Sequence, residues 1–180
     1  MLNFGEVYEI DKFLTEEEYD LATSCFYDSN NNWTFNAGEE YRRREGTPVR
    51  TFWYKELSGT VIEDIFTKKI ESILNSKITI QRIYGNGQAH GQSTWVHVDD
   101  NDEENISGSL VYYIHRNWRP YFGGHLIFVD DDELEVLKSI FPKTNSAVMF
   151  NSLMKHMALE PTVYCLEQRE SIAVKFKVLQ

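Results

Sequence analysis

The sequence predicts an α+β fold, with a jelly-roll core (a double-stranded β-helix) and N-terminal helices packed outside the sheet. Three observations lead to this prediction. The N-terminal third contains two helical patterns, and from Lys77 onward seven short β-type runs alternate with Gly, Asn, Asp and Pro turns. The 14% aromatic content also favours a sheet-rich protein. We expect a single domain over 1–180, in which 1–76 supply helical support and a substrate loop and 77–180 form the core.

Two helices are expected before the β region. Thr15 and Glu18 have the spacing of a capping box, which predicts a helix over about 15–27. Thr60 and Glu63 repeat that signal ahead of a second helix over about 58–75. The second helix is amphipathic, because apolar residues recur at helical spacing. These are Val61, Ile62, Ile65, Phe66, Ile70, Ile73 and Leu74.

A loop rich in Gly and Arg separates the helices, in "FNAGEEYRRREGTPVRTFW", and it leads into a predicted strand near 49–54. The segment 37–52 invites two interpretations. It could close over a peptide and pair its Arg residues with acidic groups, or it could be a solvated loop whose charges pair with one another.

Composition restricts the classes of partner. The formal net charge of −10 argues against nucleic acid and against an anionic membrane surface, since both require a basic footprint. No apolar run reaches the length of about 18 residues that a membrane span needs, and "MLNFGEVYEIDKFL" lacks the pattern of a signal peptide. Only Cys25 and Cys165 are present, too few for a disulfide scaffold, so we expect a reduced, cytoplasmic location.

The run "QSTWVHVDD" (92–100) alternates like a β-strand and carries His97 and Asp99 two positions apart. Residues two apart on a strand point to the same face. An imidazole and a carboxylate side by side form either two metal ligands or an ion pair, and this motif alone leaves both open.

A third candidate ligand, His156, follows Asp99 by 57 residues on a later predicted strand. Two His and one carboxylate make the facial triad of non-haem iron(II) oxygenases, which leaves positions open for substrate and dioxygen. Zinc could occupy the same ligands, but closed structural zinc sites usually have four ligands and favour Cys.

The last predicted strand, in "QRESIAVKFK", has two unlike faces. One face is apolar, with Ile172, Val174, Phe176 and Val178, and is expected to pack in the core against the helices. The other carries Arg169, Ser171, Ala173 and Lys175. Small side chains leave a hole, and an Arg at its edge can bind a dicarboxylate through two parallel hydrogen bonds. The alternative is that this face is simply solvated.

Taken in order, these motifs resemble the prolyl 4-hydroxylase-like branch of the 2-oxoglutarate/iron(II) oxygenases, from about Ile80 to Val178. "IYGNGQAHGQSTWVHVDD" resembles the segment that ends in the family's HxD motif. "LVYYIHRNWRPYFGGHLIFVD" resembles its strand, Trp-containing turn, Gly-Gly and next strand. "FPKTNSAVMFNSLMKHMALEPT" resembles the segment leading to the distal His, and "RESIAVKF" the closing strand with its 2-oxoglutarate Arg.

The resemblance implies a role for each matching residue. His97, Asp99 and His156 would hold Fe(II), and Arg169 would bind the distal carboxylate of 2-oxoglutarate. Tyr113 matches a family tyrosine whose hydroxyl reaches that carboxylate. Tyr84 lies where the family often has a tyrosine near the cosubstrate. For both tyrosines the alternative is core packing with a satisfied hydroxyl. Trp118, Gly123 and Gly124 are expected to shape a turn.

The implied reaction is hydroxylation of a C–H bond with Fe(II), 2-oxoglutarate and O2, releasing succinate and CO2, with ascorbate as a supporting reductant. A peptidyl proline or similar residue is the first expected substrate. A small-molecule hydroxylase acting on amino acids is an alternative within the superfamily. A different class of alternative is a non-catalytic, cupin-like jelly-roll binding module with the HxD pair as an ion pair.

The sequence also departs from the family pattern. Asn145 stands where a turn often has Gly, and Asn tolerates the left-handed conformation. Ala173 and Lys175 replace Thr and Trp, which predicts a more open and more basic pocket mouth. Lys175 matches the spacing of a second basic residue in the nucleic-acid demethylase branch, but the net charge argues against that branch. His125, after Gly-Gly, is the one alternative metal ligand.

Overall fold

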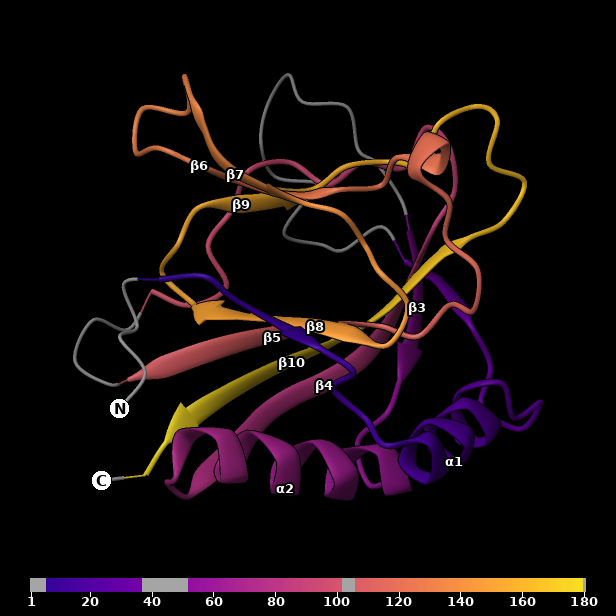
Figure 1. Cartoon of the computed structure of the whole chain (residues 1–180), viewed down its shortest axis with the longest axis vertical. Coiled ribbons are helices and arrows are strands. Elements are labelled where there is room, and N and C mark those ends of the chain that lie inside the picture. The colour runs from indigo at the N-terminus through magenta and orange to yellow at the C-terminus, as the bar shows by residue number, and fades with distance from the viewer. Residues whose placement is uncertain (1–5, 37–51, 102–105, 180) are drawn as a thin grey trace.

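The described residues form two antiparallel sheets and two α-helices (Figure 1). The structure, a computed structural model, describes residues 6–36, 52–101 and 106–179. The elements are β1 (Tyr8–Asp11), α1 (Glu16–Phe26), β2 (Thr34–Asn36), β3 (Phe52–Glu56), α2 (Val61–Leu74), β4 (Ile78–Gln88), β5 (Ser107–Tyr113), the 3-10 helix η2 (Pro120–Phe122), β6 (Leu126–Val129), β7 (Val136–Ile140), β8 (Ser146–Asn151), β9 (His156–Ala158) and β10 (Arg169–Val178).

The large sheet has seven strands in the order β1-β8-β5-β10-β4-β3-β2, and the small sheet has three in the order β7-β6-β9. The long strands β4 and β10 pair over their whole lengths, from Arg169 opposite Gln88 to Val178 opposite Ile78. Two facing antiparallel sheets confirm the predicted jelly-roll core. The N-terminal part contributes three strands to the large sheet as well as both helices. It is therefore part of the β core and not only the helical support that its sequence predicts.

Both predicted helices are present, but only one has the predicted cap. At α1, the Thr15 hydroxyl accepts a hydrogen bond from the Glu18 N–H, and the Glu18 carboxylate accepts one from the Thr15 N–H. At α2 the Thr60 hydroxyl donates to the Leu57 carbonyl instead, and Glu63 accepts from the Gly59 N–H. The second capping box is therefore wrong, because the tight turn before α2 offers each side chain a closer backbone partner.

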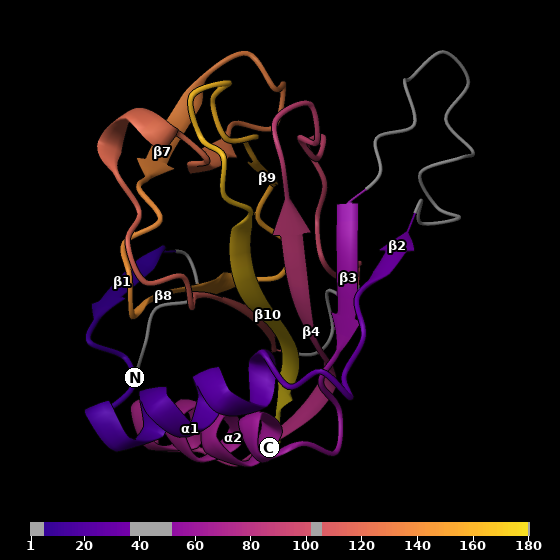
Figure 2. The same cartoon turned by 90° about the vertical axis from the view of Figure 1, so that its right-hand side faces the viewer.

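The helices cover one face of the large sheet, and the small sheet faces the other (Figures 1 and 2). Ile62, Phe66 and Ile70 of α2 are fully buried in the same apolar cluster as Ile172 and Val174 of β10. This confirms that the apolar face of the last strand packs against the helices. The opposite face of β10 therefore looks into the space between the sheets.

Asn145 adopts the left-handed conformation that the sequence allowed, with φ of 54°. Its side-chain oxygen accepts hydrogen bonds from the Leu14 N–H at 3.1 Å and the Tyr112 hydroxyl at 3.0 Å. Its side-chain amide donates to the Leu14 carbonyl. Asn145 thus fixes the β1–α1 connection against the large sheet as well as forming the turn.

The segment 92–99 is not the strand that its alternation predicts. Thr94 donates to the Ala158 carbonyl at 3.1 Å, and His97 and His156 exchange both backbone hydrogen bonds at 3.0 Å. These contacts leave His97 in an isolated bridge with His156, without a continuous ladder. The strand beside this segment, β9, has only three residues, and Asp99 already donates to the Ser152 carbonyl before that strand begins, so no regular ladder forms along the segment.

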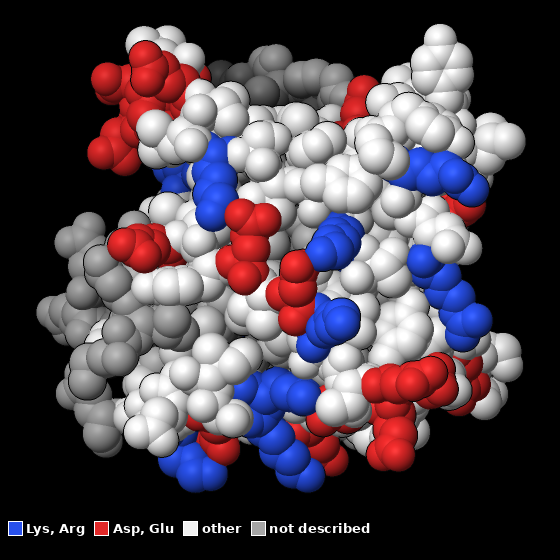
Figure 3. Space-filling view, viewed as in Figure 1, with Lys and Arg blue, Asp and Glu red and all other residues white. Residues whose placement is uncertain are grey.

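The predicted substrate loop, 37–52, falls almost entirely outside the described residues. In the part of the chain that is described, neither α1 nor α2 has the length and apolar character that crossing a bilayer requires. Figure 3 shows an acidic cluster over the β6–β7 turn, where Asp130–Asp132, Glu133 and Glu135 lie, and basic side chains interspersed with acidic ones elsewhere on that face.

Candidate active site

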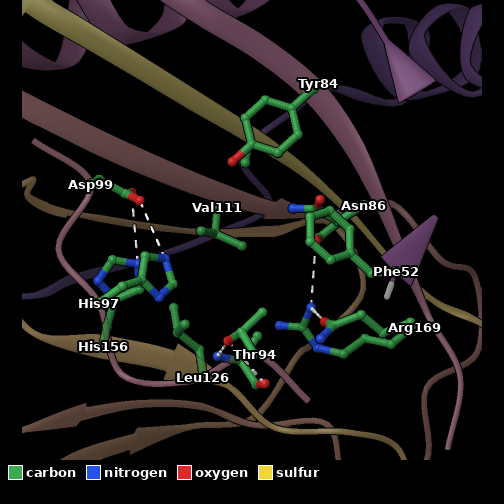
Figure 4. Close-up of a pocket in the computed structure, with 14 residues that line it drawn as sticks. Phe52, Tyr84, Asn86, Thr94, His97, Asp99, Val111, Leu126, His156 and Arg169 are labelled. Carbon is green, nitrogen blue, oxygen red and sulfur yellow. Dashed lines mark hydrogen bonds and ion pairs between the residues drawn. The ribbon is translucent and has the colours of Figure 1, made fainter. Parts of the chain in front are cut away.

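A pocket opens between the two sheets, and five of the six site residues that the sequence predicts line it, with Tyr113 as the exception (Figure 4). One end holds the two histidines and the aspartate, and the other holds Arg169. The walls come from β3, β4, β5 and β10 on one side and from β6, β9 and the 92–99 segment on the other. The lining residues are Phe52, Tyr84, Asn86, Gln88, Thr94, His97, Asp99, Val111, Leu126, His156, Ala158, Arg169, Ser171 and Ala173.

His97, Asp99 and His156 converge, as the sequence predicts. One ligand atom from each lies within 4.8 Å of the others. The Nε2 of His97 is 3.5 Å from one Asp99 carboxylate oxygen, and the Nε2 of His156 is 3.7 Å from the other. The HxD pair thus shares a face although its segment is irregular, because the bridge with His156 fixes the backbone at His97.

The backbone fixes which imidazole nitrogen is free. The Nδ1 of His97 lies 2.9 Å from the Trp95 carbonyl oxygen, and the Nδ1 of His156 lies 2.8 Å from the Met154 carbonyl oxygen. A carbonyl only accepts, so each Nδ1 carries the proton and donates it. Both Nε2 atoms then present lone pairs toward Asp99, which is the tautomer that a metal ligand needs.

The Asp99 carboxylate is held by two further groups. The Ser109 hydroxyl donates to one oxygen at 2.6 Å, and the Lys175 ammonium lies 2.7 Å from the other. Burial opposes ionisation of Asp99, but the pKa of its carboxyl is nevertheless held well below its usual range, and the Lys175 ammonium is the adjacent cation that stabilises the ionised form. Asp99 is therefore a carboxylate at neutral pH.

His156 is neutral at the same pH. Burial lowers the pKa of its imidazole to about 4, although the Asp99 charge acts in the opposite direction. A neutral imidazole beside an ionised carboxylate is already in the protonation state that metal coordination requires. Two nitrogens and one carboxylate oxygen suit Fe(II) and leave part of the coordination sphere to other ligands.

Arg169 begins β10 and is buried, with 1% of its surface exposed. Its Nε donates to the Gly124 carbonyl at 2.6 Å, and its Nη1 donates to the Gln88 side-chain oxygen at 2.9 Å. Gly124 has a φ of +74°, and a Cβ there would lie 2.9 Å from the Arg169 Cδ, so glycine permits this close approach. The sequence signals the Gly-Gly turn but not its contact with the arginine.

The partners of Arg169 are all neutral. Among the described residues it makes no ion pair with a carboxylate, and its Nη2 is buried without a hydrogen-bond partner. The Tyr113 hydroxyl is also buried and unpartnered in that part of the chain, and the guanidinium carbon lies 5.3 Å from the Tyr113 ring centre. Burial of an unpaired charge is costly, so this end of the pocket is built for an anion.

Tyr84 lies at the predicted site, whereas His125 lies outside the cluster of candidate metal ligands. Tyr84 lines the pocket from β4, and its ring stacks on Tyr54 with centres 5.3 Å apart. His125 lies beside Phe141, at 5.6 Å between ring centres. In the described residues the metal-competent cluster contains His97, Asp99 and His156 alone, so His125 is not the alternative ligand. Sequence reasoning missed the supporting residues Ser109 and Gln88, which no motif marks.

His115 is a buried group whose protonation should contribute to the loss of stability in acid. Its ring is 3% exposed, stacks on Trp118, and lacks a hydrogen-bond partner for either nitrogen within the described chain. Burial, together with the Arg169 charge, lowers its pKa to about 3. Between pH 6.5 and about 3 the unfolded state binds the extra proton, so stability is lost as pH falls through this window.

We predict that His115→Phe reduces the acid-induced decrease in the free energy of unfolding by several kcal/mol, since one pKa unit corresponds to about 1.4 kcal/mol. The phenyl ring keeps the stacking on Trp118 and cannot be protonated. Urea unfolding of both proteins at several pH values between 7 and about 4 measures the difference. Parallel pH profiles for the two proteins would contradict the assignment.

The family of the chain follows from its sequence. Residues 79–176, more than half of the chain, match the family model described as the 2OG-Fe(II) oxygenase superfamily. No curated protein sequence matches the chain. The matched segment runs from β4 to β10 and contains the three clustered candidate ligands and Arg169.

Solved structures share the fold. A prolyl hydroxylase from Trichoplax adhaerens, in complex with a hypoxia inducible factor peptide fragment, has a TM-score of 0.67 at 16% identity, covering 96% of this chain and 83% of that one. A Pseudomonas putida prolyl-4-hydroxylase has a TM-score of 0.59 at 17% identity, covering 97% and 92%. HygX from Streptomyces hygroscopicus, with nickel, 2-oxoglutarate and hygromycin B bound, has a TM-score of 0.66 at 9% identity, covering 95% and 82%.

The shared fold supports the resemblance to the prolyl 4-hydroxylase-like branch, and the sequence match favours an enzyme over a binding module. The chain belongs to the 2-oxoglutarate/iron(II)-dependent oxygenase superfamily and is a dioxygenase that uses Fe(II), 2-oxoglutarate and O2.

Proposed function

We propose that this dioxygenase hydroxylates a peptidyl proline or a similar residue, with named side chains in three roles. His97, Asp99 and His156 hold Fe(II) through both Nε2 atoms and one carboxylate oxygen. Arg169 binds the distal carboxylate of 2-oxoglutarate, and the Tyr113 hydroxyl donates to the same group. Tyr84 borders the cosubstrate from the wall of β4.

The observation that carries this proposal is the uncompensated cation at one end of the pocket. Arg169 Nη2 and the Tyr113 hydroxyl are buried donors without partners in the described part of the chain. A carboxylate accepts hydrogen bonds from both, and its charge balances the guanidinium. The opposite end of the same pocket holds the three ligand atoms, so a dicarboxylate could span the two ends.

The two ends have separate tasks. Bound Fe(II) and 2-oxoglutarate supply the oxidising chemistry, in which 2-oxoglutarate and O2 give succinate and CO2 and one oxygen atom enters the substrate C–H bond. The Trp95 and Met154 carbonyls orient both imidazoles, and Ser109 orients Asp99. The apolar side chains of Val111 and Leu126 exclude water between the ends of the pocket.

A small-molecule substrate is the second candidate. HygX has hygromycin B bound, and similar structures come from nogalamycin biosynthesis. Their TM-scores of 0.66 to 0.68 lie on either side of the 0.67 of the Trichoplax adhaerens prolyl hydroxylase, so overall shape does not separate the two substrate classes. The order of sequence motifs favours the prolyl substrate.

A mass-spectrometric screen tests the proposal. Proline-containing peptides and free amino acids are incubated with the protein, Fe(II), 2-oxoglutarate and ascorbate in air. We expect a prolyl peptide to gain one oxygen atom, with one succinate formed per hydroxylation. Omission of iron or of 2-oxoglutarate is the control. If only free amino acids gain oxygen, the proposed prolyl peptide is wrong and the substrate is a small molecule.

The role of Tyr113 has its own test. Tyr113→Phe removes a hydroxyl and keeps the ring that contacts Arg169, so it should raise the KM for 2-oxoglutarate about tenfold to hundredfold, as expected for a hydrogen bond to a charged group. Succinate formation over a range of 2-oxoglutarate concentrations measures it. An unchanged KM would show that the Tyr113 hydroxyl does not bind 2-oxoglutarate and that the residue serves only in packing.

A further inference from the structure

The pocket face of β10 carries a second cation beyond Arg169. Arg169, Ser171 and Ala173 line the pocket, and Lys175 is the next residue of the same row. Six residues of strand separate the two cations by about 20 Å along the backbone. Arg169 contacts Gly124 and Gln88 at one end, whereas the Lys175 ammonium lies 2.7 Å from Asp99 at the other. The two cations therefore serve different ends of the site.

Lys175 has hydrogen-bonding capacity to spare. An ammonium has three N–H donors, and in the described residues its one ionic partner is Asp99. Its side chain is partly exposed, at 22%, so Lys175 is not sealed inside the core. The charged groups that act on it are Asp99 and Arg82, and the Tyr84 phenol beside them is uncharged at neutral pH because burial raises its pKa. Arg82 lies directly opposite on β4, stacks on Tyr84 at 4.4 Å, and has Glu56 close enough to offset its charge.

Charge balance then singles out Lys175. With the proposed cofactors bound, the iron dication and Arg169 balance the negative charges of Asp99 and the 2-oxoglutarate dianion. Lys175 adds a positive charge that this set does not neutralise. In a protein of net charge −10, a surplus cation beside the reacting centre is a local exception that favours an anion.

We propose that Lys175 is a specificity residue, an inference that rests on the proposed function. Its ammonium binds a substrate carboxylate that lies next to the carbon that is hydroxylated. The preferred substrate is then a proline with a free carboxylate or with an acidic neighbour. The Lys175 ammonium bridges this carboxylate and Asp99, and so positions the substrate relative to the metal ligands.

Two matched pairs of probes test the inference. One pair is N-acetyl-glycyl-proline and its amide, and the other is a blocked tetrapeptide with Glu or Gln after the proline. Binding is measured by calorimetry to the protein loaded with Mn(II) and 2-oxoglutarate without oxygen, and hydroxylation is measured separately. In at least one pair we expect the carboxylate form to bind about tenfold to hundredfold more tightly.

Three variants distinguish a role of Lys175 in substrate specificity from a role in holding the Asp99 carboxylate. Lys175→Gln should abolish the carboxylate preference, and Lys175→Arg should retain it because the charge remains. Lys68→Gln removes an exposed lysine of α2, on the far side of the large sheet, and should retain the preference.

Three results would overturn the inference. The first is equal or undetectable binding of both members in both pairs. The second is a loss in Lys175→Gln that is the same for carboxylate and amide, which would make Lys175 only a support for Asp99. The third is a raised KM for 2-oxoglutarate with the preference intact. Hydroxylation of the proline in the probes that lack the carboxylate tests the proposed function independently, so either proposal can fail alone.

Discussion

His156→Ala should abolish iron-dependent turnover, lowering succinate formation by about a thousandfold or more. The substitution removes one of two nitrogen ligands and leaves a cavity beside Phe128 and Phe150, whose rings contact the imidazole. Both backbone hydrogen bonds between 97 and 156 remain available, so the bridge that places His97 should persist. The expected defect is therefore loss of metal rather than loss of the site's backbone.

Metal binding distinguishes this defect from unfolding. A ligand that binds only the folded state at a hundred times its Kd stabilises it by about 2.7 kcal/mol. We expect Mn(II) to raise the Tm of the wild-type protein and to leave that of His156→Ala unchanged. His125→Ala is the matched control, because His125 lies outside the cluster, and it should keep both metal binding and turnover. A metal response in His156→Ala, or its loss in His125→Ala, would contradict the proposed ligand set.

The candidate site could be predicted from the sequence because its candidate ligands lie at positions that local rules define. Alternation placed Arg169, Ser171, Ala173 and Lys175 on one face of the last strand, and the structure puts that face toward the pocket and the apolar face against the helices. The HxD pair was placed on one face by the same rule, although the structure holds it through the bridge to His156. The prediction of a strand was wrong there, and the prediction of convergence was confirmed.

What the sequence could not predict depends on contacts between distant segments. Ser109 reaches Asp99 from β5, and Gln88 reaches Arg169 from β4, and each is an ordinary polar residue in a strand. The Lys175–Asp99 pair joins residues 76 positions apart, so a spacing rule indicates a basic residue but not its partner. The Thr60–Glu63 box failed for a related reason: the turn geometry, which the pattern does not encode, gave both side chains other acceptors and donors.

Arg169→Gln should raise the KM for 2-oxoglutarate by about a hundredfold or more, because loss of a charge-assisted pair inside a pocket costs several kcal/mol. Burial lowers the pKa of Arg169, although a guanidinium remains protonated at neutral pH. The free protein therefore keeps a buried cation without an anionic partner in the described chain, and removing it should not lower the stability of the protein without ligand by the full cost of a lost ion pair.

Thermal stability with and without ligands therefore separates loss of 2-oxoglutarate binding from loss of the fold. We expect 2-oxoglutarate, added with Mn(II), to raise the Tm of the wild-type protein and to have little effect on Arg169→Gln, while both respond to Mn(II) alone. Arg119→Gln removes an exposed arginine before η2 and should behave as the wild type. If Arg169→Gln binds 2-oxoglutarate normally, the dicarboxylate must be held elsewhere. If it loses the response to Mn(II) as well, Arg169 supports the fold of the pocket, and the division into a metal end and a carboxylate end fails.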